Sequence, residues 1–585
     1  MPSAHGDHMA IIGIDLGTTN SLVAVMDDSG PRTLANELGE HLTPSVVAMA
    51  EDGTLLVGRA AKDRLVVAPD SGRAFFKRDM GTPTTYKFGG RTWTPTECSA
   101  AVLRELKRVA EVTLGQTVDR AVITVPAYFH DSQRQATLEA GKIAGFQVER
   151  ILNEPTAAAL AFGHTHRDHE ATLMVFDLGG GTFDVTVLQV FEGVIEVKAS
   201  GGESRLGGED YTDALLEHAL KTLGIAADPQ RRGRHRQLAE VAKRRLTSEG
   251  STTIEIDGRS LPLTRADFAA ATSGLTARLR PVVRRCLRDA GLGVDEIDDV
   301  LLVGGASRMP MISPYLLDDL KKPGNRSLDP DRVVALGAAV QAALSARDAA
   351  VQDLVLTDVC PHTLGVEIGK RFSQNDIQNG FFSPIIDRNT TVPVSRVERY
   401  STFHPEQDNI ELKIFQGESR LTAENTRLGM MNIKGLRHRK GQEDAGSMDV
   451  RFTYDMNGIL EVDVTVWSTG AKQTKVIESR PGALSPKQIE DAIRRLQPLK
   501  IHPKDSLPNR ARIERANRLY PELVGAAREA LTARLDDFQA ALESQDPVRI
   551  PQAAAVLDTF LAHFYAEEGE ARTPRRDDDD DNVGA

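Results

Sequence analysis

The stretch VFDLGGGTFDVTVLQV, residues 175–190, constrains this chain most, because it places three consecutive glycines between two aspartates. Valine-rich segments on both sides predict two strands joined by a tight turn. A Rossmann fingerprint or a P-loop would run from a strand into a helix, and the sequence contains no G-x-x-x-x-G-K-[ST] motif. Glycine lets backbone N–H groups approach an anion, whereas Asp177 and Asp184 would repel a bare phosphate. We therefore expect a phosphate held together with a cation, for which Mg²⁺ is suited.

Taken alone, this stretch could equally be a glycine-rich β-turn with solvated aspartates. A second stretch, IIGIDLGTTNSLVAVM at residues 11–26, repeats the design of strand, Asp15-Leu16-Gly17, small hydroxyl residues and strand. Its aspartate lies 162 positions before Asp177, a period far too long for a solenoid repeat. The spacing favours two related halves that each contribute one hairpin to a shared nucleotide cleft.

The composition is that of a soluble globular protein with several domains, because 585 residues exceed what one core usually holds. The net charge of −12 comes without a basic cluster, so we expect no nucleic acid partner. No apolar run approaches the roughly 20 residues that span a bilayer, and no secretory signal is apparent, so we expect no membrane association. Cys98, Cys286 and Cys360 are few and distant, which argues against disulfides and for a cytoplasmic location.

The order of periodic segments predicts the domain organisation. Strand-like and helix-like segments alternate first, as in an α/β domain, and regular short strands then indicate a β-sandwich, with Asn457-Gly458 as the clearest hairpin signal. Asp131 and Ser485 are expected to be helix N-caps, the latter followed by Pro486. The predicted segments are a disordered start at 1–9, the α/β domain at 10–350, a linker at 351–360, the β-sandwich at 361–484, short helices at 485–567 and a disordered acidic tail at 568–585.

Several segments, in order from residue 10 to about 500, resemble one family. GIDLGTTNS, ITVPAYF, ILNEPTAAALAFG, VFDLGGGTFDVTV, LGGEDY and VLLVGGASRMP are similar to the ATPase domain of the seventy-kilodalton heat-shock (DnaK) chaperones. LVLTDVCPHTLGVEI and HPEQDNIELKIFQGE resemble the linker and substrate domain of that family, especially of its HscC-like branch. The resemblance implies a duplicated, actin-like α/β ATPase domain, a β-sandwich that binds peptides and a short helical lid.

The resemblance also assigns roles in nucleotide chemistry, with ATP or ADP, Mg²⁺ and K⁺ as ligands. Lys77, Glu154, Asp177 and Thr182 match the catalytic positions, and Asp15, Asp177 and Asp184 match those that hold metal ions largely through water. A lysine at that position would stabilise charge on the γ-phosphoryl oxygens, while Glu154 would orient the attacking water. The nucleotide-binding positions are Gly17, Thr18, Thr19, Asn20, Gly179, Gly180, Gly181, Thr182, Gly207, Gly208, Glu240, Lys243, Arg244, Gly304, Gly305, Ser307 and Arg308.

Partners and coupling follow from the same resemblance. It implies a monomer that binds unfolded polypeptide clients and a J-domain co-chaperone. Coupling between the domains is assigned to Pro126, Arg134, Arg150, Asn153 and Asp358, and peptide binding to Tyr400, Phe403 and Ile410.

Three departures from the family pattern bear on function. Phe403 is far larger than the small residue usual at its position, so peptide preference should differ. The region between Thr247 and Arg265 is short, which puts an exchange-factor partner in doubt, and the short lid should release peptides easily.

Together these features predict an ATP-dependent chaperone that binds extended apolar segments. A small-molecule kinase of the same ATPase fold is the alternative, although a kinase needs no β-rich module after its second lobe. A nucleotide-binding scaffold without catalysis is disfavoured because Lys77 and Glu154 are both present.

Overall fold

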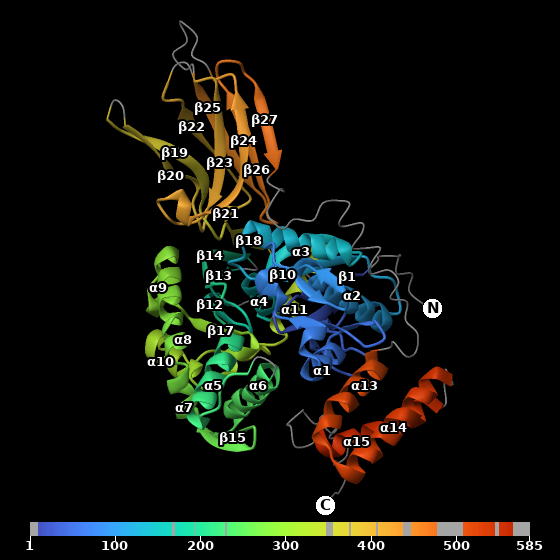
Figure 1. Cartoon of the computed structure of the whole chain (residues 1–585). Coiled ribbons are helices and arrows are strands. Elements are labelled where there is room, and N and C mark those ends of the chain that lie inside the picture. The colour runs from blue at the N-terminus through green and yellow to red at the C-terminus, as the bar shows by residue number, and fades with distance from the viewer. Residues whose placement is uncertain are drawn as a thin grey trace, which may run out of the picture. The chain divides into compact units, whose positions relative to one another are not determined.

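The computed structural model describes residues 10–166, 170–191, 194–228, 231–346, 355–373, 376–404, 407–436, 446–476, 507–544 and 549–565 (Figure 1). It forms two compact units, residues 1–499 and 500–585. The predicted helix start at Ser485-Pro486 and both predicted disordered ends lie outside the described residues.

Two six-stranded sheets form the α/β part, and their topologies correspond. In each sheet the first three strands form an antiparallel meander, and a later strand pairs in parallel with the first strand of that meander. The predicted duplication is therefore visible in the strand order. The first sheet contains β11 (Gln147–Asn153), β10 (Arg120–Val125), β1 (Ile11–Asp15), β2 (Asn20–Asp27) and β3 (Gly30–Thr33), with β4 (Thr43–Pro44) beside β2. The second contains β17 (Asp299–Val303), β12 (Ala171–Leu178), β13 (Phe183–Phe191), β14 (Val194–Glu203), β18 (Val355–Val359) and β21 (Thr391–Val392).

Helices cover both faces of each sheet, and two of them are shared. Alternate residues of β12 show this: Met174 and Phe176 face one core, whereas Leu173 and Val175 face the core built around the shared helices. The shared helices are α4 (Glu154–Thr165) and α11 (Val333–Ala346). The first sheet is covered by α2 (Pro95–Leu114) and α3 (Asp131–Ile143), and the second by α5 (Gly208–Leu223), α6 (Arg232–Ser248), α7 (Arg265–Ala271), α9 (Leu279–Ala290) and α10 (Ile312–Leu320).

Shorter helices and strands are added to both halves of the α/β part. They include α1 (Arg59–Val67), α8 (Ser273–Ala277), β5 (Val46–Met49), β6 (Leu55–Val57), β7 (Gly72–Ala74), β8 (Tyr86–Phe88), β9 (Arg91–Trp93), β15 (Ser251–Ile256) and β16 (Arg259–Thr264). The prediction of Asp131 as an N-cap was wrong by one residue. His130 has the extended N-cap backbone, and its N–H bonds to the side chain of Gln133.

A β-sandwich follows, as the alternating pattern predicts. Its two sheets share one core, in which inward-facing residues such as Val366, Ile414 and Val462 meet. Asn457-Gly458 lies in the hairpin loop between β25 and β26, although the loop is longer than two residues because Tyr454 pairs with Leu460. One sheet contains β20 (Asp376–Ile386), β19 (Leu364–Ser373), β23 (Asn409–Gln416) and β24 (Thr426–Lys434), and the other contains β22 (Val394–Ser401), β25 (Ser447–Tyr454), β26 (Leu460–Val466) and β27 (Lys472–Val476).

The second unit is helical. Its helices α13 (Leu507–Leu519), α14 (Gly525–Ser544) and α15 (Arg549–Tyr565) enclose a separate apolar core that includes Leu531, Phe538 and Leu557. Pro508 and Pro551 lie in the first turns of α13 and α15, where the missing N–H costs no helical hydrogen bond.

A substitution where α4 crosses α11 tests how closely these two helices pack. A Cβ atom at Gly337 would lie 1.7 Å from the carbonyl oxygen of Ala157, so the helices touch through their backbones. We expect Gly337→Ala to destabilise the α/β part by at least about 1–3 kcal/mol, the usual cost of overpacking. Gly274→Ala is the control, because nothing lies within 4 Å of the added methyl in α8. Calorimetric unfolding of both variants measures this, and equal melting temperatures would contradict the close crossing.

Candidate active site

The two hairpins that carry the D-L-G sequences face each other at the centre of the α/β part. The first joins β1 to β2, and the second joins β12 to β13. A Cβ atom at Gly180 would lie 1.9 Å from Thr19 Oγ1, and one at Gly181 would lie 2.6 Å from Thr18 Oγ1. The glycines are thus required by the opposing turn as well, a reason that the sequence alone did not supply.

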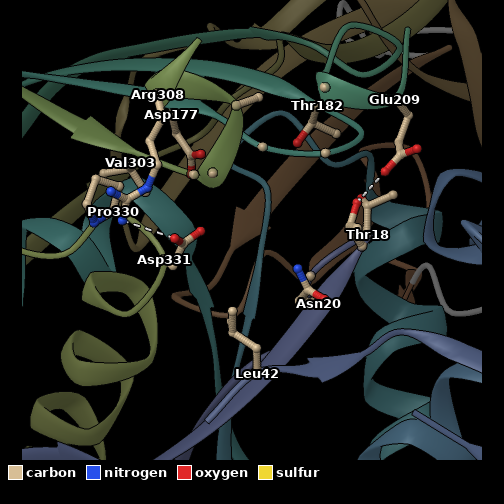
Figure 2. Close-up of a pocket in the computed structure, with 18 of the residues that line it drawn as sticks. Thr18, Asn20, Leu42, Asp177, Thr182, Glu209, Val303, Arg308, Pro330 and Asp331 are labelled. Carbon is tan, nitrogen blue, oxygen red and sulfur yellow. Dashed lines mark hydrogen bonds and ion pairs between the residues drawn. The ribbon is translucent and has the colours of Figure 1, made fainter. Parts of the chain in front are cut away.

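A cavity of about 360 Å³ opens between these hairpins (Figure 2). All predicted catalytic and nucleotide-binding residues line it except Gly181, Gly207 and Ser307. Of the predicted metal-holding residues, Asp15 and Asp177 line it and Asp184 does not. In Figure 2, Thr18, Thr182 and Glu209 lie near one end of the cavity, and Val303, Arg308, Pro330 and Asp331 lie near the other. The cavity is therefore assembled from segments far apart in the sequence.

Carboxylates crowd the floor of this cavity around one lysine. Lys77 and Glu154 are both buried, and Lys77 Nζ lies 2.6 Å from Glu154 Oε1. Burial, followed by the charge of Glu154, raises the pKa of Asp15 to about 7. The same two causes raise the pKa of Asp184 to about 7, and they raise the pKa of Asp177 well above its ordinary value. The carboxylates around Lys77 thus outnumber the positive charge that this lysine supplies.

That electrostatic deficit fits a bound cation. A divalent ion would favour the charged form of every one of these carboxylates. Among the described residues, no three histidine, cysteine, aspartate or glutamate side chains are close enough to ligate one metal ion directly.

The opposite part of the cavity is rich in ion pairs. Burial alone would raise the pKa of Glu240, but Lys243 and Arg244 outweigh it and lower the pKa to about 2. Lys243 Nζ also donates to the carbonyl oxygen of Gly208 over 2.9 Å. Arg308 donates to Asp331 over 3.0 Å, so this wall is held by charge-assisted hydrogen bonds.

Sequence reasoning missed residues that join the two halves across the cavity. Glu209 accepts a hydrogen bond from Thr19 over 2.9 Å and forms an ion pair with Arg236. Arg78 forms an ion pair with Asp210 over 2.6 Å. A signal was available, because Arg78 directly follows Lys77, while Glu209 and Asp210 directly follow the glycines of LGGEDY.

The predicted linker contains a strand that extends the second sheet. Residues Val355–Thr357 of β18 pair in parallel with β14, and Asp358 pairs with Val392 of β21. The buried Asp358 carboxylate accepts hydrogen bonds from Asn153 over 2.9 Å and from Thr156 over 3.2 Å. The linker is thereby bound to α4 and to the end of β11.

Three of the predicted coupling residues, Arg134, Asn153 and Asp358, meet at this linker. Arg134 is buried and donates to Asn153 Oδ1 over 2.6 Å, which completes a chain from α3 to Asp358. Pro126 begins the turn that contains the Arg134 acceptor Ala127. Arg150 donates instead to Gln341 of α11 over 2.7 Å, and burial lowers its pKa. The structure thus joins Arg134, Asn153 and Asp358 in one hydrogen-bond chain.

The predicted peptide-binding residues lie in the β-sandwich. Tyr400 and Ile410 are half-buried against its core, and the Tyr400 hydroxyl lies 3.1 Å from Ser383 Oγ. Phe403 is 36% exposed, and its ring would lie 2.8 Å from a Cβ atom at Gly369. Arg371 donates to the Phe403 carbonyl oxygen over 3.1 Å and covers its ring. A glycine opposite thus makes room for the large Phe403 side chain.

None of the described helices is both long and apolar enough to cross a membrane. The family model described as Hsp70 protein matches residues 11–575, which is nearly the whole chain and includes the α/β part, the β-sandwich and the helices. Members of this family are ATP-dependent chaperones that use a nucleotide with Mg²⁺, bind unfolded polypeptides and work with J-domain co-chaperones. The chain belongs to the Hsp70 family.

Proposed function

We propose that ATP hydrolysis in the cavity between the two hairpins controls how tightly the β-sandwich holds an extended apolar peptide. The observation that carries this proposal is the cluster of buried carboxylates around Lys77, at the floor of a cavity lined by both phosphate hairpins. A kinase is not favoured, because the family match continues through the β-sandwich.

The proposed roles are those that the family resemblance assigns to residues lining the cavity. Glu154 accepts a hydrogen bond from the attacking water and so orients it toward the γ-phosphorus. The Lys77 ammonium stabilises negative charge on the γ-phosphoryl oxygens, and the Thr182 hydroxyl lies on the second hairpin beside them. Asp15, Asp177 and Asp184 would hold Mg²⁺ largely through water, and the bound ion would neutralise phosphate charge. Water adds to phosphorus as the bond to the β-phosphate oxygen breaks, and ADP and phosphate leave.

Replacing the lysine tests this chemistry. Lys77→Ala should reduce ATP turnover by about 10²–10³-fold, because the charge on the γ-phosphoryl oxygens would lose a preorganised cation. ATP affinity should change much less, since many other residues line the cavity. The measurement is turnover at saturating Mg·ATP, with and without an unfolded peptide. Lys87→Ala, an exposed lysine on β8, is the matched control, and turnover near the parent value in Lys77→Ala would refute this role.

Coupling is proposed to use the chain Arg134–Asn153–Asp358. ATP-driven changes at the hairpins would alter whether β18 keeps its place on β14, and the β-sandwich follows because β19 begins a few residues later. Such linkage between two sites typically amounts to about 1–3 kcal/mol. The J-domain is proposed to act at the same place, near Arg150, Asn153 and Asp358.

Removing one charged group from this series of hydrogen bonds tests the coupling. Asp358→Asn should leave basal turnover within a modest factor, while stimulation by peptide falls by about 5–150-fold, the range for coupled sites. Arg134→Ala should behave similarly, because it removes the donor to Asn153. Asp449→Asn is the control, since Asp449 pairs with Arg399 on the β-sandwich surface. Parental stimulation in both coupling variants would exclude these residues from the relay.

Peptide preference is proposed to depend on Phe403. Its ring, covered by Arg371 and packed on Gly369, leaves less room for a bound side chain than a small residue would. An extended peptide would add backbone hydrogen bonds to a sheet edge and insert apolar side chains into pockets. We therefore expect small aliphatic side chains to bind better than bulky aromatic ones, with fast peptide exchange in the ADP state.

Peptide dissociation with ADP measures this preference. Leucine- and tryptophan-centred labelled peptides should both leave the parent quickly, and Phe403→Ala should shift the preference toward tryptophan by about tenfold or more, as expected when a large pocket opens. Phe372→Ala, another exposed phenylalanine on the neighbouring β19, is the control. An unchanged preference in Phe403→Ala would refute its role, and slow release by the parent would refute fast exchange.

Several finer assignments remain proposals. These are membership of the HscC-like branch, K⁺ as an accompanying ion, a cytoplasmic location, a role in stress response, a monomeric state and poor recognition by an exchange factor. The short β15–β16 hairpin supports the last of these.

A further inference from the structure

Two histidines stack where the β-sandwich meets the ATPase part. His362 follows the linker strand β18, and His130 caps α3. Their ring centroids lie 4.6 Å apart with an interplanar angle of 25°, and the His362 ring also lies 4.2 Å from that of Tyr128. His362 is 2% exposed, so its imidazole is removed from water by this contact.

A hydrogen bond fixes which nitrogen of His362 carries a proton. Its Nε2 lies 3.2 Å from the backbone carbonyl oxygen of Tyr128, which can only accept, so Nε2–H donates. His130 Nδ1 is buried without a hydrogen-bond partner within the described chain. The amide nitrogen and oxygen of Gln416, on β23, are also buried and unpaired there. The contact therefore shields His362 and the Nδ1 atom of His130 from bulk water.

The charged groups around the stack have the wrong sign to accept a second positive charge. Burial, followed by the presence of His130, lowers the pKa of His362 well below its ordinary value, and Arg134 and Arg285 act in the same direction. Burial likewise lowers the pKa of His130, against a smaller opposing effect of Gln416. The carboxylate of Glu418 is occupied by Thr363 and Arg388. Among the titratable and charged groups, Arg134 and Arg285 act on the stack directly, and Glu418 and Arg388 act on the adjoining Tyr128.

We propose that the His130–His362 stack makes docking of the linker and β-sandwich onto the ATPase part sensitive to pH, with acid favouring the undocked state. Protonating either ring would place a cation in a buried contact, where Arg134 and Arg285 already contribute positive charge. Undocking returns both rings to water, where protonation is unopposed. The inference concerns docking itself and holds whether or not docking controls peptide affinity.

The direction follows from linkage. An undocked histidine titrates near pH 6.5, and both docked pKa values are lower, so the docked state binds fewer protons. The stabilisation of docking by neutral histidines is complete above about pH 6.5 and is lost as the pH falls toward the docked pKa values. For each histidine that stays neutral when docked, the docking equilibrium constant falls by up to about tenfold per pH unit below this point.

The test measures docking directly in the full chain with saturating Mg·ATP. Energy transfer between a dye on the ATPase part and a dye on the β-sandwich reports the docked fraction from pH 8.0 to pH 5.5, with ATP affinity checked at each pH. The parent should undock steeply below about pH 6.5. The double variant His130→Asn, His362→Leu should show no such dependence, because leucine fills the apolar site and asparagine preserves a helix N-cap.

The controls separate the stack from other titrating groups. Asp15 and Asp184 have pKa values of about 7, and the double variant leaves both unchanged, so a pH dependence that persists there would assign the effect to them and overturn the proposal. His41→Gln removes a partly buried histidine that is hydrogen-bonded to Thr33. The docked fraction of this variant should depend on pH as that of the parent does. If the double variant fails to dock at pH 8.0, each single variant should show about half the parental slope. A flat profile for the parent, or the parental slope in both single variants, refutes the proposal.

Discussion

The close approach of the two phosphate hairpins is the constraint on which the ATPase part depends. Gly180 and Gly181 lack side chains because Thr19 and Thr18 occupy that space, so neither turn can move away without opening the cavity. This approach brings Asp15 and Asp177 together out of water, where burial, followed by the charge of Glu154, raises their pKa values. Such a floor is electrostatically complete only with cations, which agrees with the use of nucleotide and Mg²⁺ by the family.

Tyr128 connects the cavity region to the linker region through two hydrogen bonds. The Tyr128 N–H donates to Asp184 Oδ1 over 3.0 Å, and the Tyr128 carbonyl oxygen accepts from His362 over 3.2 Å. One residue thus contacts a predicted metal-holding aspartate on one side and the first residues after the linker on the other. A change in the position of Asp184 has a short physical route to the interface with the β-sandwich, parallel to the chain through Arg134 and Asp358.

Much of the site could be predicted from sequence because its motifs are local. A strand followed by Asp-Leu-Gly and a second strand is a pattern that specifies a hairpin through its turn residues. Both hairpins appear where they are expected. Boundaries were less exact, as the shift from Asp131 to His130 at the N-cap shows. Arg78 and Glu209 were missed although each adjoins a recognised motif, because their partners across the cavity, Asp210 and Thr19, lie more than 100 residues away and local patterns carry no information about them.

The sequence by itself determined the alternation of strands and helices, the two phosphate hairpins and the change to a β-sandwich, since these depend on neighbouring residues and on hydrophobic periodicity. Only the tertiary structure decided which distant groups meet. The Lys77–Glu154 pair joins positions 77 residues apart, and Asn153 reaches Asp358 across 205 residues. The stack of His130 on His362 likewise exists only because β18 joins the edge of the second sheet. Such contacts depend on the path of the whole chain, which no local pattern encodes.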